Sequence, residues 1–414
     1  MTCPKTLLRD IFGFDDFRPG QRDIVDAVID GENVLAIMPT GGGKSLCFQL
    51  PALVRDGLTV VISPLIALMR DQVRGLQAAG VAAGALTSGN TQEETDAVFA
   101  DLNAGKLRLL YLAPERLASS AMQSALRRYN VTSLAVDEAH CVSQWGHDFR
   151  PDYLRIGELR RSLGVPLAAF TATADEETRQ EITERLFDGA APRAFLHGFD
   201  RPNIHLAFSA KDNPRRQIMD FANHRKGQSG IVYCSTRAKT ETLSGALKEA
   251  GHSACYYHGG MAAEDRRVVE NRFTVEDGLI VVATVAFGMG VDKPDIRWVA
   301  HADLPKSIES YYQEIGRAGR DGGPAETLTL YGADDIRLRR SQIDEGLAPV
   351  ERKSADHGRL NALLGLAEAL KCRRRNLLGY FGESNIECDH CDLCEIPPET
   401  FDGTEAIRKA LSAI

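Results

Sequence analysis

The sequence predicts an α/β fold with two tandem, doubly wound parallel-sheet domains, followed by a small helical region that carries cysteines. Apolar runs of strand length alternate with helical stretches over residues 33–170, and the alternation returns over residues 230–331. Strands that alternate with helices are typical of a parallel sheet with helices on both faces. From about Asp334 the pattern becomes helical and charged, which indicates a third unit of a different kind.

The same pattern predicts the boundaries. It breaks at Phe199–Asn203, and this break indicates a linker. We expect domains over residues 1–200, 201–335 and 336–400, with a truncated further domain or a tail over 401–414. The expected strands are Asn33–Ile37, Leu58–Ser63, Leu107–Leu112, Leu134–Val136 and Leu167–Phe170, then Gly230–Cys234, Ser253–Tyr257, Leu279–Ala283, Trp298–Ala302 and Glu326–Tyr331.

Composition restricts the function classes. The chain has 414 residues, enough for two or three domains with their own cores. Its net charge of −8 argues weakly against binding nucleic acid over the whole surface, so local patches would have to hold any nucleic acid. No apolar run reaches membrane-spanning length, and the N-terminus lacks the apolar core of a signal peptide. We therefore expect a cytoplasmic protein with no membrane partner.

A glycine loop between an expected strand and an expected helix predicts a phosphate site. Its glycines let backbone N–H groups turn toward phosphate oxygens. Lys44 would neutralise the β- and γ-phosphates, and the Ser45 hydroxyl would hold Mg²⁺. Met38 stands where the general pattern has glycine. The loop reads Met38, Pro39, Thr40, Gly41, Gly42, Gly43, Lys44 and Ser45.

Two adjacent carboxylates follow another expected strand. Asp137 and Glu138 come directly after Val136, at the edge of a parallel sheet where loops face ligands. Asp137 can bind Mg²⁺, and Glu138 can orient and deprotonate an attacking water. Solvated surface carboxylates are the alternative interpretation.

Two arginines three residues apart, Arg317 and Arg320, predict one face of a helix. Arginine is always charged and binds phosphate oxygens as a fork. Neither residue is near the glycine loop in sequence, so both would reach a nucleotide from the opposite domain, as an arginine finger does. A surface helix with salt bridges is the alternative.

Four cysteines near the end of the chain predict a structural zinc site: Cys372, Cys388, Cys391 and Cys394. Four thiolates give zinc a closed tetrahedral site with no open position for catalysis. His390 is the competing ligand, and the even spacing of the last three cysteines makes it a bystander. Beside Cys372, a local positive patch of Lys371, Arg373, Arg374 and Arg375 is expected to touch phosphates.

Asp-Glu-Ala-His at 137–140, combined with Pro-Thr-Gly-Gly-Gly-Lys-Ser at 39–45, resembles superfamily 2 helicases. The run from Cys141 to Pro151 is similar to the aromatic-rich loop that RecQ proteins carry after this box. The resemblance extends from about Leu7 to the end of the chain and implies two RecA-like domains and a zinc-binding subdomain. Both ATP and DNA are expected ligands.

The resemblance also implies roles for single residues. Trp145 and Phe149 can stack on bases, at about 1–3 kcal/mol per base, and Arg150, His147 and His140 complete the expected nucleic-acid contacts. Packing between the domains is the alternative for the two aromatic rings. The resemblance assigns adenine recognition to Phe14, Arg18 and Gln21. It assigns a DNA phosphate contact to Thr284 and a ribose or arginine contact to Asp292. Arg320 is the expected arginine finger, and Arg317 is its partner. For the adenine motif, a capping turn is the alternative.

Together these features imply an ATP-dependent 3′→5′ DNA helicase of repair and recombination, using ATP, Mg²⁺ and Zn²⁺ on single-stranded and partially duplex DNA. A monomer near the nucleoid is expected, with single-strand-binding and recombination proteins as possible partners. Two alternatives stay open. One is a DNA-stimulated translocase that unwinds weakly because it lacks a winged-helix domain. The other is a zinc-dependent DNA-binding or annealing module for which ATP is only a switch.

Overall fold

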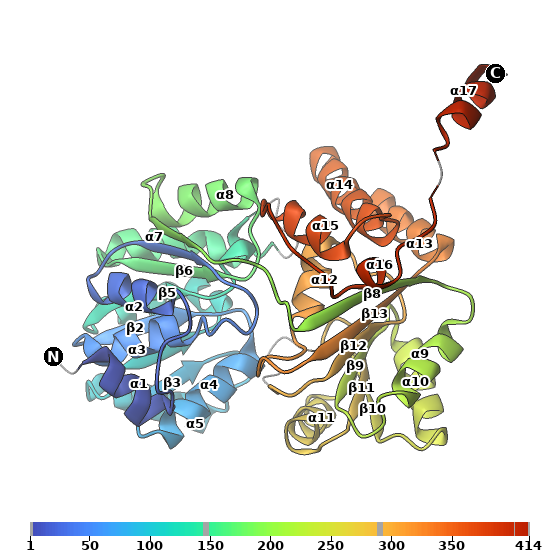
Figure 1. Ribbon diagram of the computed structural model, residues 1–414. Helices are drawn as coiled ribbons and strands as arrows, with labels where there is room; N and C mark the ends of the chain where they lie inside the picture. Colours follow the sequence, from blue (N-terminus) through green and yellow to red (C-terminus); the bar gives the residue numbers. More distant parts are fainter. Residues whose placement is uncertain (1–2, 144–148, 288–292, 401, 413–414) are drawn as a thin grey trace.

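The computed structural model describes residues 3–143, 149–287, 293–400 and 402–412. Two α/β lobes lie side by side, and a group of helices covers the second lobe (Figure 1). We call the part from α1 to β7 lobe 1, the part from β8 to β13 lobe 2, and the part from α13 to α16 the helical subdomain. The predicted fold class is confirmed.

Lobe 1 is built on a parallel sheet of seven strands in the order β3-β4-β2-β5-β6-β1-β7. Its strands are β1 (Val34–Ile37), β2 (Leu58–Ile62), β3 (Ala83–Leu86), β4 (Leu109–Leu112), β5 (Val131–Val136), β6 (Leu167–Thr171) and β7 (Arg193–Leu196). Its helices are α1 (Pro4–Phe12), α2 (Gln21–Ile29), α3 (Leu46–Val54), α4 (Ile66–Ala78), α5 (Gln92–Asn103), η1 (Pro114–Ala118), α6 (Ser120–Leu126), η2 (Ala139–Val142), η3 (Pro151–Leu154), α7 (Arg155–Leu163) and α8 (Glu176–Phe187).

Helices cover both faces of this sheet, because the central strands are buried on both sides and must be packed on both. Phe48 of α3 packs on Phe170 of β6 on one face, with ring centroids 5.4 Å apart. On the other face, Ile156 of α7 and Ile182 of α8 belong to a second buried cluster. The order of the strands brings the loops after β1 and β5 to the same edge, where the predicted phosphate loop and Asp137 lie.

Lobe 2 repeats this design with six parallel strands in the order β10-β11-β9-β12-β13-β8. Its strands are β8 (Ile204–Ala210), β9 (Gly230–Tyr233), β10 (Ala254–Tyr257), β11 (Ile280–Ala283), β12 (Trp298–His301) and β13 (Ala325–Tyr331). Its helices are α9 (Pro214–Asn223), α10 (Arg237–Glu249), α11 (Ala263–Val275) and α12 (Ile308–Ile315).

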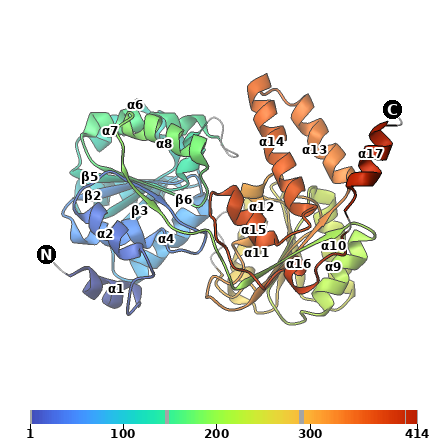
Figure 2. The ribbon, with the colours of Figure 1, turned by 45° about the horizontal axis from the view of Figure 1, so that its top comes forward.

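The helical subdomain contains α13 (Ala333–Glu345), α14 (Val350–Ala367), α15 (Arg373–Tyr380) and α16 (Asp392–Glu395). The pair α13 and α14 stands out from the body, as Figure 2 shows. The cysteine-bearing segment covers the edge strand β8, where Cys391 pairs with Leu206 and Asp392 Oδ2 accepts a hydrogen bond from Phe208 N at 3.0 Å. An edge strand that is covered in this way cannot pair with another chain.

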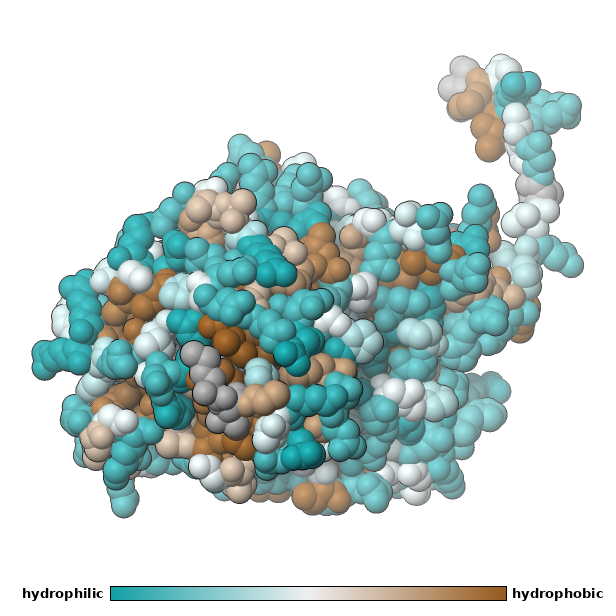
Figure 3. Space-filling view, turned by 60° about the vertical axis from the view of Figure 1, so that its left-hand side comes forward, coloured by the Kyte–Doolittle hydropathy of each residue, from teal (hydrophilic) through white to brown (hydrophobic). Residues whose placement is uncertain are grey.

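The last helix, α17 (Thr404–Ser412), projects from the body with Ile407 and Leu411 exposed (Figures 1 and 3). Among the described residues, no helix is both long and apolar enough to span a membrane.

The predicted strands all form, with ends shifted by one to three residues, and three further strands were missed. β3 has the small-residue sequence Ala-Gly-Ala-Leu, which lacks the branched residues of a typical buried strand. β7 is largely exposed at the end of its sheet, so its sequence carries little hydrophobic pattern. β8 starts directly after the predicted linker and alternates buried and partly buried positions as an edge strand does.

Candidate nucleotide site and nucleic-acid interface

The glycine loop lies between β1 and α3, as predicted. Gly41 and Gly43 both have φ of 80°, in the left-handed region that favours glycine. A Cβ on Gly43 would lie 2.2 Å from Gln21 Nε2. The loop therefore depends on glycine for its backbone conformation and for the close approach of Gln21.

Lys44 reaches back across the loop toward the end of β1. Its Nζ donates to the carbonyl oxygens of Met38 at 3.3 Å and Pro39 at 3.5 Å. Burial lowers the pKa of Lys44, whereas the nearby carboxylates of Glu138 and Asp137 raise it. The predicted phosphate-binding amine and the two predicted catalytic carboxylates are therefore close enough for their charges to interact.

Ser45 takes part in a chain of polar side chains that sequence reasoning did not find. Ser45 Oγ accepts a hydrogen bond from Gln72 Nε2 at 2.8 Å. Gln49 Nε2 donates to Gln72 Oε1 at 3.4 Å and to the Tyr111 hydroxyl at 2.8 Å. No motif in the sequence indicates this chain of contacts, because its members come from α3, α4 and β4 and only the fold brings them together.

Asp137 lies directly after β5 and is buried. Its Oδ2 accepts from Ser63 Oγ at 3.2 Å, and its Oδ1 accepts from Glu138 N at 3.0 Å. Burial raises the pKa of Asp137 to about 7, the charge of Glu138 adds to this rise, and Lys44 opposes it. A carboxylate whose negative charge is destabilised by burial suits a divalent cation, because the cation offsets the cost of the buried charge.

Glu138 has φ of 49° and ψ of 48°, a left-handed conformation that is rare outside glycine and costs about 1–3 kcal/mol. Its Oε2 is buried and has no hydrogen-bond partner among the described residues. His140 Nδ1 lies 3.4 Å from this oxygen. An unsatisfied carboxylate oxygen in a strained loop has the free lone pair that a general base needs.

His140 is only 3% exposed, and its Nδ1 lies 2.9 Å from Thr171 Oγ1 at the end of β6. This position corrects the prediction of a nucleic-acid contact, because a buried ring cannot reach a strand on the surface. The ring instead links Glu138 to the threonine run after β6, where the Thr171 hydroxyl donates to Thr173 O at 3.0 Å.

The predicted adenine motif lies beside the phosphate loop. Gln21 is 3% exposed, its Nε2 donates to Gly42 O at 3.1 Å, and its Oε1 accepts from Arg18 N at 2.8 Å. Arg18 also donates to the carbonyl oxygen of Gly41. Phe14 is 52% exposed. Both ends of the Gln21 amide are engaged within the chain, and its pairing with adenine remains a prediction.

The two predicted arginines come from lobe 2 and do not lie on a helix face. Helix α12 ends at Ile315, and residues 316–320 form a turn in which Gly319 has φ of 55°. We call residues 316–320 the arginine turn. The helix prediction failed because spacing alone does not register the glycines that end the helix.

The arginine turn faces the glycine loop. Arg320 Cγ lies 3.2 Å from where a Cβ on Gly41 would stand. Arg317 is buried behind it, where its guanidinium opposes the burial that raises the pKa of Tyr233 to about 12. The two lobes enclose a cleft of about 320 Å³ lined by Arg18, Pro39, Thr40, Gly41, Gly42, Arg201, Asn203, Gly319, Arg320, Asp321 and Gly322.

Arg201 is a further residue that sequence reasoning missed, because it lies in the stretch interpreted as a linker. Its Nη1 donates to Thr40 O of lobe 1 at 2.8 Å, and its Nη2 donates to Gly319 O of the arginine turn at 2.8 Å. The signal available in the sequence was a lone arginine at the break between two α/β patterns.

The predicted nucleic-acid residues lie on more than one element. Thr284 follows β11 at the carboxyl edge of the lobe 2 sheet. Phe149 and Arg150 are half-buried before η3, and Arg150 Nη1 donates to Pro64 O at 3.4 Å. Trp145, His147 and the predicted ribose contact Asp292 lie outside the described residues.

The four predicted zinc cysteines come together between α15 and α16. Their sulfur atoms all lie within 4.8 Å of one another. Tetrahedral Zn–S bonds of about 2.3 Å place sulfur atoms about 3.8 Å apart, so the four thiols fit zinc with a small contraction. His390 is not part of this group.

The predicted positive patch beside Cys372 is wrong for two of its four members. Arg373 and Arg374 are 5% and 4% exposed. Arg373 forms an ion pair with Asp392 at 3.0 Å, and Arg374 forms one with Asp200 at 2.7 Å. These side chains bind protein acceptors and cannot touch DNA phosphates. Lys371 and Arg375 are exposed.

Comparisons with known proteins agree with this arrangement. Three family models match in succession: DEAD/DEAH box helicase at residues 18–182, helicase conserved C-terminal domain at 213–322, and RecQ zinc-binding at 333–395. Among solved structures, Mycobacterium smegmatis helicase Lhr bound to ssDNA and AMP-PNP has a TM-score of 0.62 at 23% identity, covering 82% of this chain and 49% of that one. For S. cerevisiae Dbp5 bound to RNA and ADP BeF3, the TM-score is 0.64 at 18% identity, with coverage of 86% and 97%. These two likenesses establish the fold.

Curated relatives are closer in sequence. The Haemophilus influenzae ATP-dependent DNA helicase RecQ is 44% identical over 99% of this chain and 66% of its own length. The Bacillus subtilis ATP-dependent DNA helicase RecQ is 39% identical over 99% of this chain and 70% of its own length. The chain spans 65–66% of the Haemophilus influenzae and Pasteurella multocida proteins, slightly less than two thirds, and 29–56% of the eukaryotic relatives it matches. Because the chain is 39% identical to the Bacillus subtilis protein over 70% of that protein's length, and because three helicase family models match it in succession, this chain belongs to the RecQ family of ATP-dependent DNA helicases.

Proposed function

We propose that this chain is the motor of an ATP-dependent 3′→5′ DNA helicase, which couples ATP hydrolysis to movement along single-stranded DNA and to duplex unwinding in repair and recombination. The observation that carries the proposal is the cleft in which the glycine loop of lobe 1 faces Arg320 of lobe 2. A nucleotide in this cleft would touch both lobes, so its hydrolysis would change how the lobes are held together.

The lobe 1 residues supply binding and proton transfer. The backbone N–H groups of Gly41 and Gly43 and the amine of Lys44 would bind the phosphates, whereas the N–H of Gly42 donates to Pro39 O at 2.9 Å. Ser45 and Asp137 would hold Mg²⁺. A bound Mg²⁺ supplies charge neutralisation at the phosphate oxygens. Glu138, with its unsatisfied Oε2, is assigned as the base that orients and deprotonates the attacking water.

The lobe 2 residues supply charge stabilisation. Arg320 is assigned as the finger on the γ-phosphate, and Arg317 as the residue behind it. Arginine fingers accelerate phosphoryl transfer by about a thousandfold or more in GTPases. Because Arg320 reaches the phosphates only when the lobes are close, hydrolysis and lobe closure are coupled, and repeated closure converts hydrolysis into steps along a strand.

DNA is assigned to the stretch that follows η2 and to Thr284 of lobe 2. Ser143 comes directly after η2, five residues after Glu138, and is buried, and its Oγ donates to Glu181 Oε2 at 2.6 Å. Phe149 and Arg150 of this stretch are assigned to DNA contacts, and so are Trp145 and His147, which lie outside the described residues.

A translocase that unwinds weakly is the alternative within this class. ATP turnover with and without single-stranded DNA, measured beside unwinding of a duplex with a 3′ tail, separates the cases. The helicase proposal expects stimulation by DNA and unwinding. Turnover without unwinding selects the translocase, and turnover that DNA does not stimulate contradicts both.

Glu138→Gln is expected to bind ATP and DNA with wild-type affinity and to hydrolyse ATP at least about a hundredfold more slowly, because the amide cannot accept the proton of water. A fluorescent ATP analogue measures binding, and phosphate release measures turnover. Turnover within a few fold of wild type would remove Glu138 from the role of base. An annealing module that uses ATP only as a switch would be unaffected in annealing by this change.

A further inference from the structure

The linker residue Arg201 joins three parts of the molecule. Its guanidinium donates to Thr40 O of the glycine loop at 2.8 Å and to three carbonyl oxygens of lobe 2, those of Gly316 at 3.2 Å, Ala318 at 2.9 Å and Gly319 at 2.8 Å. Three of these acceptors belong to the arginine turn that carries Arg320. One planar side chain therefore fixes the backbone on both sides of the nucleotide cleft.

The geometry requires an arginine. The fork of a guanidinium presents donors in fixed directions, so it can serve several carbonyl oxygens at once. A lysine has one nitrogen atom and cannot reach acceptors of both lobes with the same alignment. Burial lowers the pKa of Arg201, and the neighbouring charges of Arg320 and Arg18 lower it further. Three arginines thus gather at the cleft, where a triphosphate would offset their repulsion.

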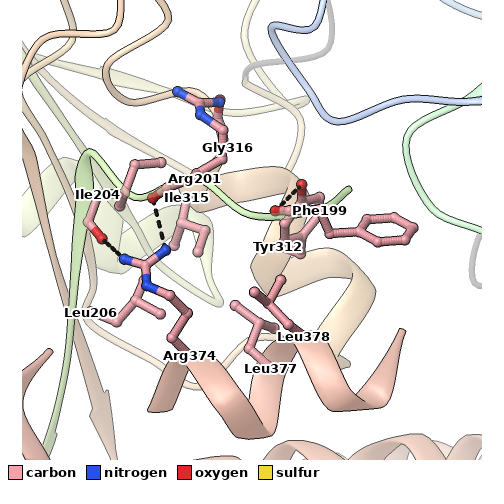
Figure 4. Close-up of a pocket in the computed structure, with 10 residues that line it drawn as sticks. All are labelled: Phe199, Arg201, Ile204, Leu206, Tyr312, Ile315, Gly316, Arg374, Leu377 and Leu378. Atoms are coloured by element: carbon pink, nitrogen blue, oxygen red, sulfur yellow. Dashed lines mark hydrogen bonds between the residues drawn. The ribbon is translucent and has the colours of Figure 1, made fainter. Parts of the chain in front are cut away.

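The backbone of Arg201 is held from its other side by the helical subdomain. Arg374 of α15 donates to Arg201 O at 2.8 Å and to Ile204 O at 2.6 Å (Figure 4). It also donates to Asp200 Oδ1 at 2.7 Å. Arg374 is two residues after the zinc-site residue Cys372. The position of the linker is therefore tied directly to the first turn of the helix that begins at the zinc site.

Phe199, at the start of the linker, is held by residues of lobe 2 and of the helical subdomain. The Tyr312 hydroxyl of α12 donates to Phe199 O at 2.9 Å (Figure 4). The Phe199 ring stacks on Phe381 with centroids 4.5 Å apart. Glu383 accepts a hydrogen bond from Phe199 N. The space left beneath the linker is about 10 Å³, too small for a side chain to move into, so the backbone of Arg201 has little freedom to shift.

We propose that Arg201 is a positioning residue for ATP hydrolysis. Its guanidinium links Thr40 of the glycine loop to the arginine turn. Arg374 of the helical subdomain fixes its backbone position through a hydrogen bond to Arg201 O. This inference rests on the proposed function. It assigns the linker a specific role: the side chain of Arg201 joins the two lobes beside the nucleotide, in addition to the contacts that the glycine loop and the arginine finger make with the nucleotide.

The test uses the full chain with three substitutions. Arg201→Ala removes the contacts to both lobes. Arg201→Lys keeps the charge and loses the fork. Arg55→Ala is the matched control, because Arg55 also donates to three carbonyl oxygens, those of Val28 at 2.9 Å, Ile29 at 3.3 Å and Thr132 at 3.1 Å, but all within lobe 1 and outside the cleft. Each variant is checked for zinc content and melting temperature.

Two quantities are measured with saturating single-stranded DNA: kcat and KM for ATP, and the release rate of a fluorescent non-hydrolysable ATP analogue. For Arg201→Ala we expect kcat to fall by about ten- to a hundredfold, since a small displacement of a reacting group can cost a hundredfold. Analogue release should be about tenfold faster, because the closed lobes no longer retain the nucleotide. Arg201→Lys should lie between Arg201→Ala and wild type, and Arg55→Ala within about threefold of wild type.

If Arg201→Ala matches Arg55→Ala in both measurements, with zinc and melting temperature unchanged, the proposal is overturned. If only the melting temperature falls, the role of Arg201 is structural and the proposal is likewise wrong. Should the wild-type chain show no DNA-stimulated hydrolysis, the proposed function fails, but the release rates of the analogue still decide whether Arg201 fastens the two lobes.

Discussion

Two arginine-bearing segments of this chain look alike in sequence and differ in the structure. The arginine turn at 316–320 lies at the rim of the cleft between the lobes, with Arg320 against Gly41. The segment 373–375 begins α15, and its first two arginines are buried against Asp392, Asp200 and backbone carbonyl oxygens. Both were predicted to bind phosphates, and only the first is placed to do so.

A cluster of arginines in a sequence therefore does not by itself indicate anion binding, because its place in the fold decides which groups the guanidinium meets. The first turn of α15 meets two carboxylates and several carbonyl oxygens. The arginine turn receives hydrogen bonds from Arg201 and Asn203 on its backbone, and Arg320 lines the cleft opposite the glycine loop. The buried arginines of α15 thus belong to the protein interior, whereas Arg320 belongs to the proposed nucleotide site.

Arg320→Ala is expected to show the largest effect on this comparison. Removing the finger should lower kcat by about a thousandfold, or about 4 kcal/mol of transition-state stabilisation, and leave the melting temperature within about 1 °C. Steady-state hydrolysis and thermal unfolding of the same preparation measure both. A loss of stability as large as the loss of rate would place Arg320 with the structural arginines.

Arg374→Ala is expected to show the opposite balance. It removes a buried donor from Asp200 and two carbonyl oxygens, and breaking a buried pair of this kind costs about 3–5 kcal/mol of unfolding free energy. Chemical denaturation monitored by fluorescence measures the loss. The exposed neighbour provides the control: Arg375→Ala should change stability by about 1 kcal/mol or less. Equal effects of the two changes would contradict the structural role of Arg374.

Asp137→Asn tests the stability cost of the buried carboxylate that follows β5. Burial raises the folded-state pKa of Asp137 from 3.8 to about 7. The folded state therefore holds its proton more tightly than the unfolded state, and the stability of the nucleotide-free protein falls as pH rises from about 4 to about 7. The asparagine variant lacks this cost.

We expect Asp137→Asn to raise the melting temperature more at pH 8 than at pH 5, by about 2–4 °C for each kcal/mol relieved, in the absence of nucleotide and Mg²⁺. Thermal unfolding across this pH range checks the prediction. A larger gain at pH 5 would mean that the buried carboxylate is stabilised in its charged form.

Much of the fold and site was readable from the sequence because each motif combines a local backbone rule with a chemical group. The glycine loop, Asp137 at the end of β5 and the four cysteines are of this kind, and the structure places them as predicted. Edge strands were harder, since β7 and β8 carry weak hydrophobic patterns. His140 and Arg374 were misassigned because their burial depends on contacts with Thr171 and Asp200, residues 31 and 174 positions away.

Arg201 shows most clearly what a single sequence cannot supply. Its acceptors belong to Thr40, Gly316, Ala318 and Gly319, and they are backbone oxygens that any residue would provide. No pattern of side chains therefore indicates the contact. Only the packing of two lobes and the helical subdomain brings these atoms together.

The central claim is that one chain supplies both halves of a single nucleotide site. Mixing Lys44→Ala with Arg320→Ala tests it most directly, because each variant lacks one half. Phosphate release by the mixture, with saturating ATP and single-stranded DNA, should stay at the low rate of the separate variants. Recovery toward half the wild-type rate would show that lobes of different chains complete the site, and would contradict the account.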